Sequence, residues 1–293
     1  MIVKRNLSVR RVAAYISRPM AWVAAWSVAV PAMSLVVDDD RLVAPFAPAG
    51  AIGAALAIFI AFRNNSAFGR WMEGRAAWQS ILVASRAITR QVIASTDNAL
   101  AMGEIDRSTA ERYRRETTSL LSTFARSVAA PFRPSLGATS APPTMVTVEL
   151  GVLIKRGIRD GALGQFDPIA LEPQLAALNN AQGTIERIAS TPTLRQYDFF
   201  TRRFVELFAV LAPFAIIGLV PDRVWWTVPL SIAVSGVFVI MAVTGAANDE
   251  PFSGMVTDVP IEAVCAEVDH DLAVLLGAPN PPPLAQPVDG YLW

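Results

Sequence analysis

Four stretches of the chain are almost free of charged side chains. They cover residues 19–37, 42–62, 204–221 and 224–248, and Glu206 is the one charged residue within them. Each is about as long as the ~20 residues that a helix, rising ~1.5 Å per residue, needs to cross the hydrocarbon core of a bilayer. Lipid offers the backbone no hydrogen-bond partners, so a crossing segment of this kind must be helical. The sequence therefore predicts an all-α membrane protein with four transmembrane helices.

The composition agrees with this prediction and excludes several other classes of protein. Only 17% of the residues are charged, against about a quarter in a soluble domain, and 53% are hydrophobic. A disordered chain has the reverse composition, and the single cysteine, Cys265, excludes a disulfide scaffold. Lys plus Arg equals Asp plus Glu at 25 each, so the basic excess typical of nucleic-acid-binding proteins is missing and no nucleic-acid partner is expected.

Lysine and arginine are distributed unevenly between the connecting segments. Residues 1–18 carry five of them and residues 63–203 carry eighteen, whereas the two short turns contain only Arg41 and Arg223. Because cytoplasmic segments are enriched in basic residues, we expect 1–18 and 63–203 in the cytoplasm. Four spans then place both termini in the cytoplasm. A cleaved signal peptide is the weaker alternative, since the first apolar stretch is long for one and a second span follows closely.

The segment between the second and third stretches is too long for a loop and is predicted to be helical. Apolar residues recur at helical spacing after residue 66, so one long helix is expected to continue from the second span. Ser108, with Glu111 three residues later, is typical of a helix start. The helices expected outside the four spans cover residues 66–96, 109–130, 145–157, 167–190 and 259–276.

The predicted organisation has six parts. A short N-terminal segment, two pairs of transmembrane helices and a large cytoplasmic region are followed by a cytoplasmic helix and a proline-rich tail that is extended or disordered. Their bounds are 1–18, 19–62 (spans one and two), 63–203, 204–248 (spans three and four), 249–276 and 277–293.

Residues that carry enzymatic chemistry are scarce. The chain has one histidine, His270, and it lacks the short motifs of zinc proteases, nucleotide-binding loops and serine hydrolases. Cys265, His270 and Asp271 are close enough in sequence to ligate a metal, although a helix with one buried cysteine and a polar face is the simpler interpretation. We therefore expect no enzyme activity, no cofactor and no metal site.

The segment 50–78 is rich in small residues and then in aromatic and basic ones. Ala54, Ile58 and Phe62 are spaced by four and fall on one face of a helix. Several copies of that face would line a dry, narrow pore, and such apolar constrictions gate by dewetting. Ordinary helix packing explains the same spacing, and the spacing alone favours packing.

Three sequence motifs resemble the bestrophin family, and its bacterial branch in particular. The first is Phe-Arg-Asn-Asn-Ser-Ala-Phe-Gly-Arg-Trp-Met-Glu-Gly-Arg at 62–75, with Trp78 after it. The second is Ala-Gln-Gly-Thr-Ile-Glu-Arg-Ile at 181–188, followed by Thr-Pro at 191–192 and Tyr-Asp at 197–198. The third is Asn-Asp-Glu-Pro-Phe-Ser-Gly at 248–254. The resemblance covers about residues 5–275.

The resemblance implies a homopentameric ion channel in the inner membrane of a bacterium. In that family five copies of the second transmembrane helix line an apolar neck, which the motif register places at Ala54, Ile58 and Phe62. A cytoplasmic aperture lies just after a proline that corresponds to Pro173, so it falls at Gln174 or Leu175. Animal members bind calcium through acids after the third motif. Here that region, 249–258, offers at most three acidic residues, and no calcium gating is expected.

The conducted ion is less constrained. The family is known mainly for anion channels, so chloride is favoured slightly, and a sodium-selective channel of the same architecture is the alternative. Arg63, Arg70 and Arg75 follow the neck and either concentrate anions in the vestibule or act as structural anchors, for example in salt bridges with Glu73. A secondary transporter and a non-conducting scaffold are weaker alternatives, since no charge lies mid-membrane. The expected partners are other copies of the chain, membrane lipid and small inorganic ions.

Overall fold

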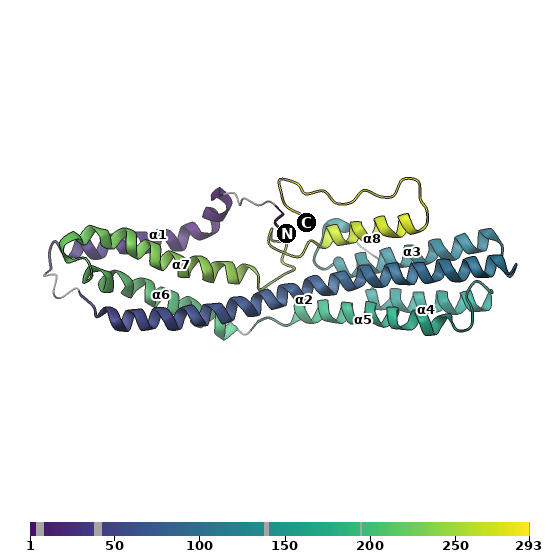
Figure 1. The fold of residues 1–293 in the computed structure, drawn as a ribbon, viewed down its shortest axis with the longest axis horizontal. Coiled ribbons are helices and arrows are strands. Elements are labelled where there is room, and N and C mark those ends of the chain that lie inside the picture. Colours follow the sequence, from purple (N-terminus) through teal and green to yellow (C-terminus); the bar gives the residue numbers. More distant parts are fainter. Residues whose placement is uncertain (4–8, 38–42, 138–140, 194, 293) are drawn as a thin grey trace. The chain divides into compact units, whose positions relative to one another are not determined.

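A computed structural model describes residues 1–3, 9–37, 43–137, 141–193 and 195–292 (Figure 1). Within these residues the chain is helical, without a named strand, as the sequence predicts. Two isolated β-bridges are present in the described residues, between Ile2 and Tyr291 and between Val288 and Tyr291. The helices are α1 (Val9–Met33), α2 (Phe46–Ala101), α3 (Arg107–Ala129), η2 (Pro134–Leu136), α4 (Pro143–Arg159), α5 (Asp167–Ser190), α6 (Arg195–Ile217), η3 (Pro221–Trp226), α7 (Thr227–Ala247) and α8 (Ile261–Leu275).

The chain forms two compact units. The first, here called the large unit, contains Met1–Val3, Trp71–Thr191 and Pro251–Trp293. The second, here called the apolar unit, contains Lys4–Arg70 and Pro192–Glu250. The long helix expected after the second apolar stretch is present as α2, whose 56 residues contribute to both units.

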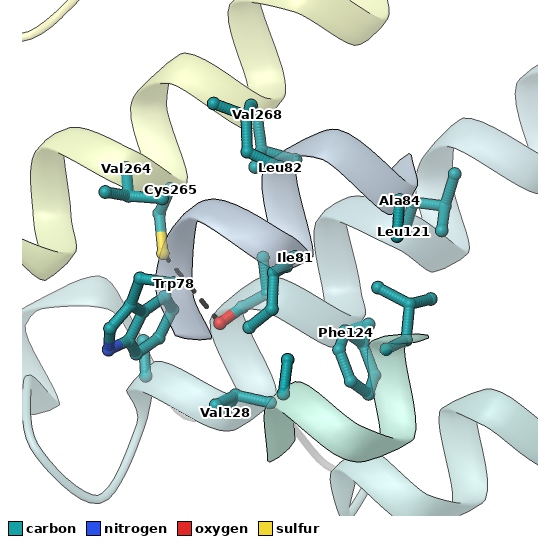
Figure 2. Packing of buried hydrophobic residues seen from close by; sticks show 14 of the residues in the cluster. Trp78, Ile81, Leu82, Ala84, Leu121, Phe124, Val128, Val264, Cys265 and Val268 are labelled. Atoms are coloured by element: carbon teal, nitrogen blue, oxygen red, sulfur yellow. Dashed lines mark hydrogen bonds between the residues drawn. The ribbon is translucent and has the colours of Figure 1, made fainter. Parts of the chain in front are cut away.

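The core of the large unit is built around the second half of α2. Trp78, Ile81 and Leu82 are fully buried there, and α3 and α8 supply side chains around them (Figure 2). Side chains of α5 belong to the same cluster. Burying a large apolar side chain contributes ~1.5–3 kcal/mol, so this cluster holds α8 against α2 and α3. Cys265 belongs to it, with its thiol 3.8 Å from the carbonyl oxygen of Ala125.

The apolar unit is formed by α1, α6, α7 and the first half of α2. Its small core contains Val23, Leu56, Ile60 and Phe208. By length and composition, two helical segments of the described chain are apolar enough to cross a membrane, Pro48–Ala101 and Pro221–Ala247.

The start of α3 differs from the sequence prediction. Asp106, and not Ser108, is the N-cap, because its carboxylate accepts a hydrogen bond of 2.8 Å from the backbone N–H of Thr109. Ser108 donates its hydroxyl to the same carboxylate at 2.8 Å. The capping box therefore does not form, and Glu111 instead pairs with Arg107 one turn earlier.

The tail after α8 is extended, which is one of the two states that its proline content allowed. It returns to the first residues of the chain (Figure 1). The N–H of Val3 donates to the carbonyl of Gly290 at 3.0 Å, and the N–H of Leu292 donates to that of Met1 at 2.9 Å.

Candidate pore helix and the joint of the three motifs

The first half of α2 has one covered and one bare face. Leu56 and Ile60 are 3% and 0% exposed and pack in the apolar unit, whereas Ile58 and Phe62 are 60% and 70% exposed. Ala54 is exposed on the same side as Ile58 and Phe62. The three residues predicted for the neck thus form a continuous bare apolar stripe.

A glycine permits the covered face to approach its neighbour closely. A Cβ atom on Gly53 would lie 2.9 Å from Cε2 of Phe208 on α6, closer than real Cβ contacts allow. The small residues of segment 50–78 therefore have a structural role here, because a glycine lets two helix backbones come close together. Gly53 and Phe208 therefore fix the position of the bare stripe relative to α6.

Arg63 lies on the covered face of α2, one residue after Phe62. It is 8% exposed, donates to the carbonyl of Ala242 at 2.9 Å and forms an ion pair of 2.5 Å with Asp198. The next residue, Asn64, donates its amide to the carbonyl of Met241 at 3.0 Å. The first motif therefore ties α2 to the end of α7 and the start of α6.

Side chains from all three motifs meet in the large unit. Glu73 of the first motif pairs with Arg187 of the second. A Cβ atom on Gly74 would lie 3.0 Å from Cζ of Phe252 in the third, and the indole of Trp71 donates to the carbonyl of Thr257 at 3.0 Å. The motifs thus form one structural joint, which the sequence could not show because its members are up to about 180 residues apart.

The other two predicted basic residues lie in different units. Arg70 is partly buried and lines a cavity of the apolar unit. Arg75 is partly buried in the large unit. The pKa of the Met1 amino group is lowered mainly by burial, and the positive charge of Arg75 lowers it further.

The two candidates for the aperture differ in burial. Leu175 is 8% exposed and packs in the core of the large unit beside Leu171 and Leu178, whereas Gln174 is only partly buried. Two apolar side chains near the start of α5 are strongly exposed, Phe166 at 80% and Ile169 at 72%. Neither residue was predicted as a site residue, although both flank Asp167-Pro168, the predicted start of a helix.

Asp258, in the loop after α7, and Arg133, between α3 and η2, form a buried ion pair that was not predicted from the sequence. Asp258, which is 1% exposed, accepts hydrogen bonds from the N–H groups of Gly254 and Met255 at 2.6 and 3.0 Å. The guanidinium of Arg133 lies 3.8 Å from it and donates to the carbonyl of Phe252 at 3.2 Å. Burial raises the pKa of Asp258, opposed by these hydrogen bonds and by Arg133.

The residues considered as metal ligands in α8 are engaged separately. Burial raises the pKa of the Cys265 thiol to about 12, Asp271 pairs with Arg86, and Nδ1 of His270 lies 2.7 Å from the carbonyl oxygen of Pro282. Among the described residues, no group of three or more His, Cys, Asp or Glu side chains is placed to hold a metal ion.

Comparison with known proteins agrees with the resemblance of the three motifs. A family model described as "Bacterial/Fungal Bestrophin protein" matches residues 6–274. The chain belongs to the bestrophin family.

The matching relatives have similar lengths. A "voltage-dependent anion channel-forming protein" of Ralstonia nicotianae is 27% identical over 241 residues, which cover 80% of this bestrophin and 78% of the relative. A protein of the same description from Salmonella typhi is 28% identical over 236 residues, covering 77% and 75%.

The fold matches that of solved bestrophins. A crystal structure of a bacterial bestrophin homologue from Klebsiella pneumoniae is 24% identical with a TM-score of 0.75 over 88% of this chain and 97% of that one. A variant structure of the same homologue has a TM-score of 0.77 at 24% identity, over 91% and 98%.

Proposed function

We propose that this bestrophin is a homopentameric channel that conducts small monovalent anions such as chloride across a bacterial inner membrane. Family membership and the described relatives, which are named as anion channel-forming proteins, support the class of function. In this proposal the parts of α1, α2, α6 and α7 within residues 19–62 and 204–248 span the bilayer. The segments 1–18, 63–203, 249–276 and 277–293 lie in the cytoplasm, as the distribution of Lys and Arg favours.

The observation that carries the proposal is the bare stripe on α2. Ile58 and Phe62 are 60% and 70% exposed, although the alternate residues Leu56 and Ile60 are buried. A stripe used only for packing within one chain is covered in that chain, so lipid or other copies of the chain must cover this one. The family resemblance, which places the second transmembrane helix around the pore, favours a surface shared by several copies. Five copies of Ala54, Ile58 and Phe62 around an axis form three apolar rings, a constriction that gates by its wetting.

At the second constriction, the aperture, we favour Gln174 over Leu175. Leu175 contributes to the core of the large unit and is 8% exposed, so it has little side chain to offer to a pore. Gln174 is polar and partly accessible, and a ring of glutamines presents amide donors and acceptors to a passing ion. Such an aperture is a weaker barrier than an apolar ring.

The burial of Arg63 bears on ion selectivity, because it leaves fewer arginines that could attract anions into the vestibule. Arg63 is 8% exposed and pairs with Asp198 at 2.5 Å, so we favour a structural role for it over that of a vestibule charge. Arg70 and Arg75 remain as candidates for attracting anions, against Asp167 and Glu172 on α5, which favour cations. A sodium-selective channel of the same architecture is therefore the second candidate.

The test is a recording of the purified protein in a planar bilayer with asymmetric NaCl. Unitary current steps that reverse near the chloride equilibrium potential are the expected result. Steps that reverse near the sodium potential would establish the cation channel instead. Saturable flux without steps would identify a transporter, and an absence of both would leave a non-conducting membrane scaffold.

A further inference from the structure

Two cavities adjoin within the apolar unit. One, of about 360 Å³, is lined by apolar side chains of α1, α6 and α7, among them Trp22, Val23 and Val239. The other, of about 530 Å³, lies at the start of α6 and the end of α7. They share five lining residues, Arg63, Asp198, Arg202, Glu206 and Ala246, so an elongated molecule can occupy both.

The second cavity is here called the arginine cavity, because five arginines line it: Arg63, Arg70, Arg195, Arg202 and Arg203. Four carboxylates line it as well, Asp198, Glu206, Asp249 and Glu250, so the lining carries one more basic than acidic side chain. Arg203 pairs with Glu206 at 2.7 Å, and Asp249 accepts a hydrogen bond from Thr193 at 2.5 Å.

The arginine cavity keeps an excess of one positive charge over its carboxylates. Asp198 is shared by Arg63 at 2.5 Å and Arg202 at 2.9 Å, so one carboxylate serves two guanidinium groups. Arg195 forms no ion pair with a described residue, and it is also the first residue of α6, where the helix dipole adds partial positive charge. The cavity is therefore complementary to an anion.

Aromatic side chains indicate the depth of this cavity in a bilayer. Tyr197, Phe199 and Phe200 at the start of α6 are 49%, 55% and 47% exposed. Trp225 and Trp226 are 56% and 55% exposed before α7, whose 21 residues rise ~31 Å. Trp and Tyr concentrate at the two bilayer interfaces. With Tyr197 near one interface and Trp225 and Trp226 near the other, the arginine cavity lies at the headgroup level and the apolar cavity lies at the depth of the acyl chains.

We propose that the two cavities together bind one anionic phospholipid, with its phosphate in the arginine cavity and an acyl chain in the apolar cavity. The inference rests on the membrane placement in the proposed function but not on ion conduction. Free phosphate has no apolar part that could fill the apolar cavity. A phospholipid places its phosphate beside the arginines and an acyl chain among the apolar side chains. The site is formed within one chain and is repeated in every copy of an oligomer.

The test is native mass spectrometry of the purified full-length protein with added phosphatidylglycerol or phosphatidylcholine of identical acyl chains. Wild type is compared with Arg195→Gln/Arg202→Gln, and with a matched control, Arg107→Gln/Arg115→Gln, which removes two exposed arginines of the large unit. We expect the first double variant to bind phosphatidylglycerol about 5- to 30-fold more weakly, since each basic side chain near an anionic headgroup contributes a factor of about five. Phosphatidylcholine binding and the control variant should be unchanged.

A second variant, Ala246→Leu, fills the junction of the two cavities without changing charge. We expect it to lower the affinity for phosphatidylglycerol, while inorganic phosphate at millimolar concentration fails to displace the lipid from wild type. Equal retention of both lipids by wild type, or unchanged phosphatidylglycerol binding in the double arginine variant, would refute the site. Selective lipid binding by a protein that shows no current would uphold the site and count against the channel.

Discussion

At the scale of single residues, neighbours on α2 have opposite environments. Phe62 is 70% exposed and Arg63 is 8% exposed, the reverse of what a soluble helix shows. The ~100° rotation per residue separates the two faces, and the spacing of Ala54, Ile58 and Phe62 identifies one face from sequence. The partners Asp198 and Ala242 decide that Arg63 is covered, and these lie more than 130 residues away.

The neck assignment predicts the effect of shortening its side chains. Ile58→Ala/Phe62→Ala should raise unitary conductance severalfold, because a wider neck wets more readily. Val237→Ala, which shortens an exposed apolar side chain of α7, serves as the control and should leave conductance unchanged. Planar-bilayer recordings measure both. Unchanged currents in the double variant would remove Ile58 and Phe62 from the pore.

Asp258 leads to a prediction about calcium. Its carboxylate is already bound by two backbone N–H groups and lies beside Arg133, so it has little capacity left to coordinate a cation that needs six to eight oxygen ligands. Currents should be the same in millimolar calcium and in a calcium chelator. A reversible loss of current on chelation, absent in Asp258→Asn, would contradict this.

At the scale of the elements, close contacts and caps decide where helices begin and how near they approach. Gly53 brings α2 against Phe208 of α6, whereas Gly151 of α4 has open space around it. The apolar pattern predicted both helices, but only their packing distinguishes a required glycine from a replaceable one.

The two glycines should respond in opposite directions. Gly53→Leu inserts a side chain into a filled space and should destabilise by about 1–3 kcal/mol. Gly151→Ala should stabilise by about 0.5–1 kcal/mol, since alanine loses less backbone entropy in a helix. Apparent melting temperatures of the purified proteins should shift by ~2–4 °C per kcal/mol. Equal shifts for both variants would show that the contact with Phe208 is unimportant.

The cap of α3 predicts a pH dependence. Hydrogen bonds from Thr109 and Ser108 lower the pKa of Asp106 from its ordinary value of 3.8 to about 2. A lowered pKa means that the stabilisation is complete above pH ~3.8 and is lost as the pH falls through about 2. Asp106→Ala should therefore melt lower than wild type at pH 7, and the difference should shrink towards pH 2. Asp106→Asn keeps the cap and should be free of this pH dependence; a difference that grows in acid would oppose the assignment.

At the scale of the whole molecule, the three motifs are a joint of the large unit as well as a family signature. Glu73, Arg187 and Phe252 come from separate motifs. Arg187 pairs with Glu73, and Phe252 packs against the neighbouring Gly74. Residues at such a joint are constrained together, because a change in one alters its partners in the other two.

The proposed pentamer predicts the mass of the particle in solution. Mass photometry in detergent should give a protein mass near five times the 31.5 kDa of the chain, because five copies of α2 enclose the proposed neck. Ile58→Asp/Phe62→Asp places charges on that stripe and should weaken the assembly. A monomer or dimer for wild type would contradict both the pentamer and the shared neck.

The sequence by itself determined the helical class, the long α2 and the family, and it left the tail after α8 open between extended and disordered. These rest on local periodicity, composition and contiguous motifs. Only the tertiary structure decided that Arg63 pairs with Asp198, that Leu175 belongs to the core, that Asp106 caps α3, and that Arg133 faces Asp258. The physical reason is that helix formation depends on neighbours three or four residues apart, whereas burial and charge pairing depend on residues that the chain brings together only on folding.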